Sequence, residues 1–317
     1  MPSAILEQLD TLGPQQCEAM SYDQAAAYTR ELVRSHYENF TVVSWFLPRR
    51  LRDDFAHVYA FCRWADDLGD ETGDPRRSLD LLAWWRRELD ACYAGRPRHP
   101  VFVALARTIE RHDIPRKPFE DLIAAFEQDQ TVTRYDTWEQ VLDYCTRSAD
   151  PVGRLVLYLC DLPDEHRHRL SDHTCTALQL ANFWQDVRRD ILERDRVYLP
   201  RDVAELHGLD IDAMVAAVRG DGDVAALRPA YCAAVHDLVD RTWPMFAEGR
   251  RLWPLVPPDV RVDVKLFTLG GEAILRMIQR QGYDTLASRP SLSKAAKIAL
   301  MSQAAMGKLW SGVCGHG

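Results

Sequence analysis

Apolar residues recur three and four positions apart along most of the chain, whereas the alternation of apolar and polar residues that marks half-buried strands is nearly absent. Three- and four-residue spacing places apolar side chains on one face of a helix. The chain has 317 residues, 47% of them hydrophobic, so such helices can bury a large core without a disulfide or a structural metal. The sequence therefore predicts an all-α protein in which residues 1–317 form a single domain.

Local signals indicate where helices begin and break. Ser21-Tyr22-Asp23-Gln24 and Thr137-Trp138-Glu139-Gln140 have the form of capping boxes. Pro48 suits the first turn of a helix, because its missing N–H would be unpaired there anyway. Asp150-Pro151-Val152-Gly153 predicts a break, which is either a simple kink or a place where backbone approaches a ligand. We expect further helices at 78–93, 101–112, 119–130, from 171 past 190, at 225–251 and at 259–280.

Charge and cysteine content narrow the function classes. The net charge of −8 argues against a nucleic-acid-binding protein, which would carry a basic excess. The eight cysteines are scattered without a C-x-x-C pair, which predicts buried free thiols in a reducing compartment. No signal-peptide pattern begins the sequence, and no apolar run reaches the roughly 20 residues that span a bilayer. We therefore expect a cytoplasmic protein, either soluble or peripheral at the inner face of the cell membrane.

A first cluster of carboxylates lies within the segment 59–71. If this segment is helical, Tyr59, Arg63, Asp66, Asp67 and Asp70 share one face. Such a face repels itself unless a cation binds to it, and a cluster of oxygen ligands suits Mg²⁺, which is commonly shared with substrate phosphates. The alternative interpretation is an acidic helix end that water solvates.

A second polar stripe strengthens the metal hypothesis. Gln179, Asn182, Asp186 and Asp190 are spaced by three, four and four residues, so they fall within roughly an 80° arc of a helix that is otherwise rich in apolar residues. Two such stripes can face one another across a bundle and hold metal ions. A di-iron centre would need Glu-x-x-His pairs, which neither stripe contains, so the pattern favours Mg²⁺ bound together with a diphosphate.

The two motifs, Tyr-x-x-x-Arg-x-x-Asp-Asp-x-x-Asp at 59–70 and Gln-x-x-Asn-x-x-x-Asp-x-x-x-Asp at 179–190, resemble those of the squalene and phytoene synthases. These are the head-to-head prenyl synthases of the all-helical isoprenoid synthase fold. The resemblance covers nearly the whole chain and includes Tyr144-Cys145 and Val197-Tyr198-Leu199-Pro200. It implies an isoprenoid synthase-type helical bundle with a central substrate cavity.

Within this family the sequence is most similar to the hydroxysqualene synthase branch, HpnC. The segments that carry this similarity are His36-Tyr37-Glu38-Asn39-Phe40 and Arg289-Pro290-x-Leu292-Ser293-Lys294. Gln185 also supports it, because squalene and phytoene synthases commonly have arginine immediately before the aspartate that follows. The implied reaction is ionisation of presqualene diphosphate and capture of water, which gives hydroxysqualene and diphosphate in hopanoid biosynthesis without NADPH.

The resemblance also implies residue roles. Five carboxylates would hold Mg²⁺, directly or through water: Asp66, Asp67, Asp70, Asp186 and Asp190. Five side chains would bind the substrate: Arg63, His36, Gln179, Asn182 and Tyr198. Three aromatic side chains would line the reacting centre: Tyr59, Tyr144 and Phe40. Asp129 is a further candidate carboxylate. Each aromatic residue has an alternative role in the core, and a lone histidine such as His36 is more often structural.

Three questions stay open at the level of sequence. One alternative reaction is condensation of two prenyl diphosphates to presqualene diphosphate, squalene or phytoene, and a non-enzymatic alternative is an inactive scaffold on the same fold. The basic, amphipathic segment from Lys294 to Trp310 is expected either to pack on the protein or to contact a membrane surface. A presqualene diphosphate synthase is the expected functional partner.

Overall fold

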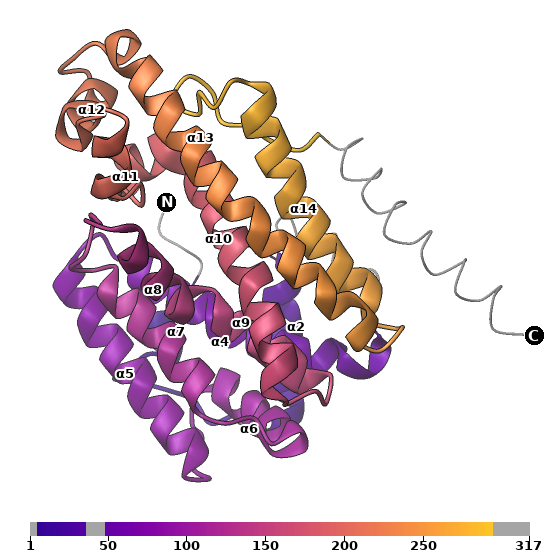
Figure 1. Ribbon diagram of the computed structural model, residues 1–317. Helices are drawn as coiled ribbons and strands as arrows, with labels where there is room; N and C mark the ends of the chain where they lie inside the picture. Colours follow the sequence, from indigo (N-terminus) through magenta and orange to yellow (C-terminus); the bar gives the residue numbers. More distant parts are fainter. Residues whose placement is uncertain (1–4, 36–47, 294–317) are drawn as a thin grey trace, which may run out of the picture. The chain divides into compact units, whose positions relative to one another are not determined.

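The computed structural model describes residues 5–35 and 48–293, and all the regular elements in these ranges are helices (Figure 1). Two isolated β-bridges, Leu12 with Cys17 and Arg134 with Val197, add short extended contacts. The prediction of an all-α protein is therefore confirmed. No helix among the described residues is long and apolar enough to cross a membrane.

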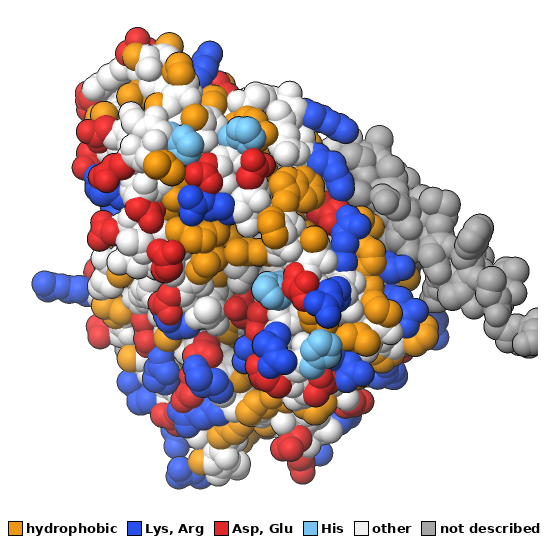
Figure 2. All heavy atoms as spheres, viewed as in Figure 1, with side chains coloured by type: hydrophobic (Ala, Val, Ile, Leu, Met, Phe, Trp, Pro, Cys, Tyr) orange, Lys and Arg blue, Asp and Glu red, His pale blue; other side chains and the backbone are white. Residues whose placement is uncertain are grey.

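Contacts divide the chain into two compact units, and each has its own helices. Unit 1 comprises residues 1–132 and 151–168, and unit 2 comprises residues 133–150 and 169–317. This division does not test the prediction of a single domain, which stays a prediction. In Figure 2, acidic, basic and hydrophobic side chains are interspersed over the visible face.

Unit 1 is organised around α4 (Arg52–Asp70), which follows the 3-10 turn η2 (Arg49–Leu51) and packs against four other helices. These are α2 (Tyr22–Ser35), α5 (Pro75–Tyr93), α6 (Pro100–His112) and α7 (Lys117–Gln128). The unit also contains η1 (Leu6–Gln8), α1 (Leu9–Leu12) and most of α9 (Asp150–Leu159). The buried face of α4 carries Phe61 and Trp64, whose rings stack at 5.9 and 5.4 Å, respectively, from the ring of Trp85 on α5. This aromatic core fixes α4 and leaves its polar face for other contacts.

Unit 2 contains most of α10 (Glu165–Arg194), with α13 (Val224–Gly249) and α14 (Arg261–Arg280) packed on it. Glycines let these helices approach: a Cβ atom on Gly249 would lie 3.1 Å from the backbone nitrogen of Thr174, and one on Gly271 would lie 2.7 Å from the Cδ2 atom of Leu178. The remaining elements are α8 (Trp138–Ser148), α11 (Arg201–Leu206), α12 (Ile211–Arg219) and η3 (Arg250–Leu255).

Most of the predicted helix ends lie within two residues of the observed ends, but the helix predicted from 78 begins at Pro75. The backbone N–H groups of Gln24 and Gln140 donate to the side chains of Ser21 and Thr137, as capping boxes require. The break at Asp150 separates α8 from α9. The predicted start of the long helix at 171 is wrong, because α10 begins at Glu165, where the Asp164 carboxylate accepts from the backbone N–H of Arg167 at 3.0 Å.

The cysteine prediction is confirmed in part. All the cysteines in the described part of the chain are free. Cys92, Cys145 and Cys160 are buried, whereas Cys17, Cys62, Cys175 and Cys232 are only half-buried, so the prediction of burial was wrong for these four.

Candidate functional site

The first acidic stripe occupies the C-terminal half of α4. Arg63 lies within it and pairs with carboxylates of its own helix: its Nη2 atom is 2.5 Å from Oδ1 of Asp67, and its Nη1 atom is 3.4 Å from Oδ2 of Asp66. The Asp67 side chain is 1% exposed, whereas the Asp66 side chain is 42% exposed. The stripe therefore combines one buried ion pair, to Asp67, with a second and more exposed ion pair, to Asp66.

The position of this stripe at a helix C-terminus is electrostatically unfavourable. The last turn of α4 holds Asp67 and Asp70 and contains no basic residue, and Glu71 is its C-cap. The C-terminal end of a helix carries a partial negative charge, so each carboxylate there is destabilised by about 0.3–1 kcal/mol. A cation bound to this end would remove that repulsion.

Two further predicted residues belong to unit 1. Tyr59 is half-buried one turn before Arg63, and burial raises the pKa of its hydroxyl while the charge of Arg63 opposes the rise. Asp129 is buried at the C-cap of α7. A Cβ atom on Gly69 would lie 3.4 Å from Phe126 and 3.6 Å from the Gln130 amide nitrogen, so the C-terminal ends of α4 and α7 pack closely. Asp129 thus lies on the helix end that packs against the acidic end of α4.

The second stripe lies on α10. Gln179, Asp186 and Asp190 are half-buried and Asn182 is exposed. Arg289, from the segment after α14, binds both oxygens of Asp186: its Nε atom donates to Oδ1, and its Nη2 atom donates to Oδ2 at 3.1 Å. The Asp186 carboxylate is therefore already matched by a cation in this structure.

Asp190 has an unusual electrostatic environment. Burial raises the pKa of its carboxyl to about 7, the charge of Asp186 one turn earlier adds to the rise, and nearby arginines oppose it only partly. The carboxyl therefore gains and loses its proton near neutral pH. A divalent cation at Asp190 would favour the ionised form and displace the proton.

Aromatic side chains form a cluster in unit 2. The rings of Tyr198 and Phe183 stack with centroids 3.7 Å apart and planes at 6°, and Tyr144 lies 5.7 Å from Tyr198 and 6.1 Å from Phe183. Tyr135 stacks on the other side of Tyr198 at 5.7 Å. All four rings are buried. Two predicted site residues, Tyr144 and Tyr198, are thus brought together, with two rings that the sequence analysis did not select.

Some predicted residues lie outside the described part of the chain, and some residues near the predicted ones did not stand out in the sequence. His36 and Phe40 lie outside the described residues, as does the amphipathic segment 294–310. Sequence reasoning did not identify Arg289 as a partner of Asp186, nor Tyr135 and Phe183 as ring partners of Tyr198. Phe183 carried a local signal, because it is adjacent to Asn182 within the second motif.

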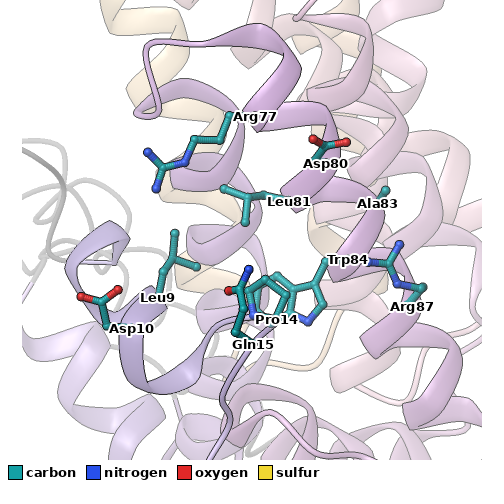
Figure 3. Close-up of a pocket in the computed structure, with 10 residues that line it drawn as sticks. All are labelled: Leu9, Asp10, Pro14, Gln15, Arg77, Asp80, Leu81, Ala83, Trp84 and Arg87. Carbon is teal, nitrogen blue, oxygen red and sulfur yellow. The ribbon is translucent and has the colours of Figure 1, made fainter.

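A surface cavity of about 470 Å³ occurs in unit 1 between the N-terminal segment and α5 (Figure 3). Its lining includes Leu9, Pro14, Arg77, Trp84 and Arg87, and none of the predicted site residues contributes to it. The two basic side chains project from α5 ten residues apart and point in different directions in the view (Figure 3). This cavity is therefore not the candidate site.

The residues of both stripes fit Mg²⁺ by their chemistry. Their donors are carboxylate and amide oxygens without thiols or imidazoles, which is the ligand set of a hard cation. The repulsion at the end of α4 and the raised pKa of Asp190 are both relieved by a cation. Among the described residues, no three His, Cys, Asp or Glu side chains converge as a ready-made metal cluster. Mg²⁺ commonly keeps several waters and uses substrate phosphates as ligands, so it does not require such a cluster.

Comparison with known proteins identifies a family that resembles this chain in both sequence and structure. The squalene/phytoene synthase family model matches residues 33–296. A hydroxysqualene synthase of Rhodopseudomonas palustris is 34% identical over 80% of this chain and 83% of its own length, and a phytoene synthase of Thermus thermophilus is 31% identical over 86% and 90%. The crystal structure of squalene synthase HpnC from Alicyclobacillus acidocaldarius superimposes with a TM-score of 0.75 at 47% identity and covers 83% of this chain and 95% of its own.

A dehydrosqualene synthase crystallised with a ligand shares the fold at a TM-score of 0.76, with 22% identity over 92% of this chain and 98% of its own. The sequence motifs, the helical architecture and the matched length point the same way. The chain belongs to the squalene/phytoene synthase family, whose members are prenyl diphosphate-processing enzymes.

Proposed function

We propose that this enzyme is a hydroxysqualene synthase that converts presqualene diphosphate and water into hydroxysqualene and diphosphate. The observation that carries the proposal is the pair of oxygen-donor stripes on α4 and α10. The α4 stripe ends in carboxylates without a basic residue in the last turn, and burial raises the pKa of Asp190 on α10. The similarity to hydroxysqualene synthases and to HpnC supports this substrate.

In the proposed reaction, the C–O bond to the diphosphate breaks and both electrons leave with the diphosphate. A water oxygen then forms a C–O bond to the carbocation, and one proton of that water is released. Bound Mg²⁺ would supply charge neutralisation of the leaving diphosphate. Asp66, Asp67 and Asp70 would hold the ions on α4, and Asp186 and Asp190 would hold them on α10.

The other site residues would bind the diphosphate and protect the cation. Arg63 would keep its pair with the buried Asp67 and offer its remaining N–H groups to a diphosphate oxygen. Gln179 and Asn182 would orient water and the departing group. The buried rings around Tyr144 and Tyr198 would stabilise the carbocation by about 0.5–2 kcal/mol each and exclude bulk water. His36, Phe40 and Tyr59 keep their predicted roles at the substrate.

The chemistry needs no reductant, because water and not hydride captures the cation. We therefore propose that the enzyme acts without NADPH. Its product is too apolar for water, so we place the enzyme in the cytoplasm at the inner face of the membrane, with segment 294–310 as the proposed contact. A presqualene diphosphate synthase would supply its substrate for hopanoid formation.

A second candidate function is condensation of two prenyl diphosphates. The observation that favours it is the similarity to a phytoene synthase. The phytoene synthase of Thermus thermophilus is 31% identical to this chain, and the hydroxysqualene synthase of Rhodopseudomonas palustris is 34% identical. Both reactions ionise an allylic or cyclopropylcarbinyl diphosphate, so both would use the same stripes. Product analysis separates the two.

The test is to give the purified chain and Mg²⁺ either presqualene diphosphate or farnesyl diphosphate, each with and without NADPH, and to identify products by gas chromatography and mass spectrometry. We expect hydroxysqualene from presqualene diphosphate and no effect of NADPH. A condensation product from farnesyl diphosphate would instead establish the second candidate.

Variants then test the site itself. Asp66→Asn and Asp186→Asn should each abolish turnover and remove the rise in melting temperature that Mg²⁺ plus inorganic diphosphate produces. Asp143→Asn is the matched control, because Asp143 is an exposed carboxylate on α8 that pairs with Arg147. Full activity in both stripe variants would refute the assignment of the stripes.

A further inference from the structure

The segment that follows α14 begins with a tight turn. Gly282 and Tyr283 have φ angles of +68° and +65°, so the chain reverses direction immediately after the helix (Figure 1). The side-chain amide of Gln281 donates to the backbone carbonyls of Asp284 and Ser288, both at 3.1 Å. One side chain thus closes the loop across seven residues.

Unit 2 anchors this loop at two further points. The carboxylate of Asp284 lies 2.8 Å from the Nε atom of Arg228 on α13. The hydroxyl of Thr285 lies 2.5 Å from the hydroxyl of Tyr231, and both side chains are buried. Segment 281–290 is therefore held on α13 before it reaches α10.

At α10, two consecutive residues bind two consecutive residues of this segment. The buried amide of Gln185 donates to the carbonyl of Pro290, and the Asp186 carboxylate accepts both N–H groups of the Arg289 fork. Proline has no N–H, so its carbonyl is the only backbone group through which a side chain can hold residue 290 by a hydrogen bond. Gln185 supplies that donor from a side chain that is 5% exposed.

Among the described residues, Arg289 lies closer to the Asp186 carboxylate than Arg189 does. Arg189, one turn away on α10, lies 4.0 Å from the Asp186 carboxylate and donates to Glu193 at 2.9 Å. Arg289 by contrast covers both oxygens of Asp186. A metal ion that approaches Asp186 must compete with this guanidinium for the same oxygens.

We propose that Gln185 is a positioning residue that holds Pro290 so that Arg289 stays on Asp186 and competes with Mg²⁺ for that carboxylate. The inference rests on the proposed function, because it takes Asp186 as a Mg²⁺ ligand. Tethering raises the effective concentration of the guanidinium at Asp186. The strength of the Gln185 contact thereby sets the affinity of the second stripe for the ion.

The test measures Mn²⁺ binding to the full chain by the electron paramagnetic resonance signal of the free ion, without substrate. Arg289→Gln should tighten Mn²⁺ binding about three- to ten-fold, since it removes one positive charge from a half-exposed, bidentate pair. Gln185→Met keeps the length of the side chain but loses the donor, and it should tighten binding about two- to five-fold. The double variant should bind no more tightly than Arg289→Gln alone.

Two further variants make the test independent of folding effects. Thr242→Val removes the buried hydrogen bond from Trp184, the neighbour of Gln185, so it should lower stability without changing Mn²⁺ affinity. Gln281→Met loosens the same segment from its other side and should tighten Mn²⁺ binding even if the Gln185 variant fails to fold.

The outcomes distinguish this inference from the proposed function. Unchanged affinity in Gln185→Met, while Arg289→Gln binds more tightly, would overturn the role of Gln185 and leave the metal site intact. Additive tightening in the double variant would also overturn it, because Gln185 would then act without Arg289. Failure of both the unaltered protein and Arg289→Gln to bind Mn²⁺ would overturn this inference, whereas the proposed function is tested separately by product analysis and by the melting temperature with Mg²⁺ plus inorganic diphosphate.

Discussion

Replacement of Asp190 by asparagine should stabilise the protein in a pH-dependent way. Burial and the neighbouring charge of Asp186 raise the pKa of the Asp190 carboxyl from 3.8 to about 7 in the folded state. Between these values the folded protein retains a proton that the unfolded chain releases. The stabilisation by this bound proton is complete below about pH 3.8 and is lost as the pH rises through about 7. Asparagine stays neutral throughout and does not suffer this loss.

The size of the effect follows from the pKa difference. One pKa unit corresponds to about 1.4 kcal/mol, so the shift sets an upper limit of roughly 4 kcal/mol at pH 8. Asp190 is only half-buried, and solvent screening reduces this figure, so we expect a gain of about 1–2 kcal/mol. For a chain of this size, the melting temperature should rise by about 2–5 °C at pH 8 and remain nearly unchanged at pH 4.

Thermal unfolding followed by circular dichroism at pH 4, 6 and 8 would measure the difference in melting temperature. Asp143→Asn is again the matched control, because the hydrogen bond from Arg147 lowers the pKa of Asp143 and its replacement should give no gain at pH 8. A melting temperature of Asp190→Asn equal to or below that of the parent at pH 8 would refute the electrostatic reasoning. A gain of the same size at pH 4 and pH 8 would refute it as well.

Three further predictions concern stability. Glu272→Gln should lower the free energy of unfolding by about 2–4 kcal/mol in urea titrations, because the buried carboxylate accepts from Arg250 at 2.7 Å and from Arg276 at 2.9 Å. An unchanged free energy of unfolding would contradict a structural role for these ion pairs. Gly271→Ala should lower the free energy of unfolding by about 1–3 kcal/mol, since its Cβ atom would lie 2.7 Å from the Cδ2 atom of Leu178. At Gly270 the space is open, so Gly270→Ala should be neutral or stabilising by up to about 1 kcal/mol. Equal effects in the two variants would contradict the close packing of α10 and α14. Burial lowers the pKa of His99 from 6.5 to about 3, so the folded protein keeps this imidazole neutral where the unfolded chain would protonate it. Roughly 2–4 kcal/mol of the free energy of unfolding should therefore be lost as the pH falls from 6.5 toward 3. His99→Gln should flatten this part of the pH–stability profile.

Features set within one helix could be predicted from the sequence. Both capping boxes, the break at Asp150 and the common face of Tyr59, Arg63 and Asp67 depend on residues within about one turn to three turns of each other. The sequence pattern places the start of α10 six residues late, because the cap at Asp164 precedes the apolar periodicity of the helix. Helix ends can therefore be predicted from the sequence where the apolar periodicity begins at the capping residue.

Contacts between distant segments could not be predicted. Arg289 pairs with Asp186 across 103 residues, and the carbonyl of Pro290 accepts from Gln185 across 105. Helical periodicity states which face a residue occupies but not which segment reaches that face. The same limit explains why Tyr144 and Tyr198 were selected singly, whereas their stacking with Tyr135 and Phe183 emerged only from the structure.

The two acidic stripes share a property that bears on their role. The end of α4 places carboxylates against the negative end of its dipole without a basic residue in the last turn. On α10, burial and the charge of Asp186 raise the pKa of Asp190 to about 7. Asparagine in place of Asp190 would remove this cost, whereas the buried Asp67 is stabilised by its ion pair with Arg63. Residues that destabilise a fold in the absence of its ligand are expected at functional sites, because there they are retained for function and not for stability. We propose Mg²⁺ with a diphosphate as that ligand, because a hard divalent cation accepts oxygen donors.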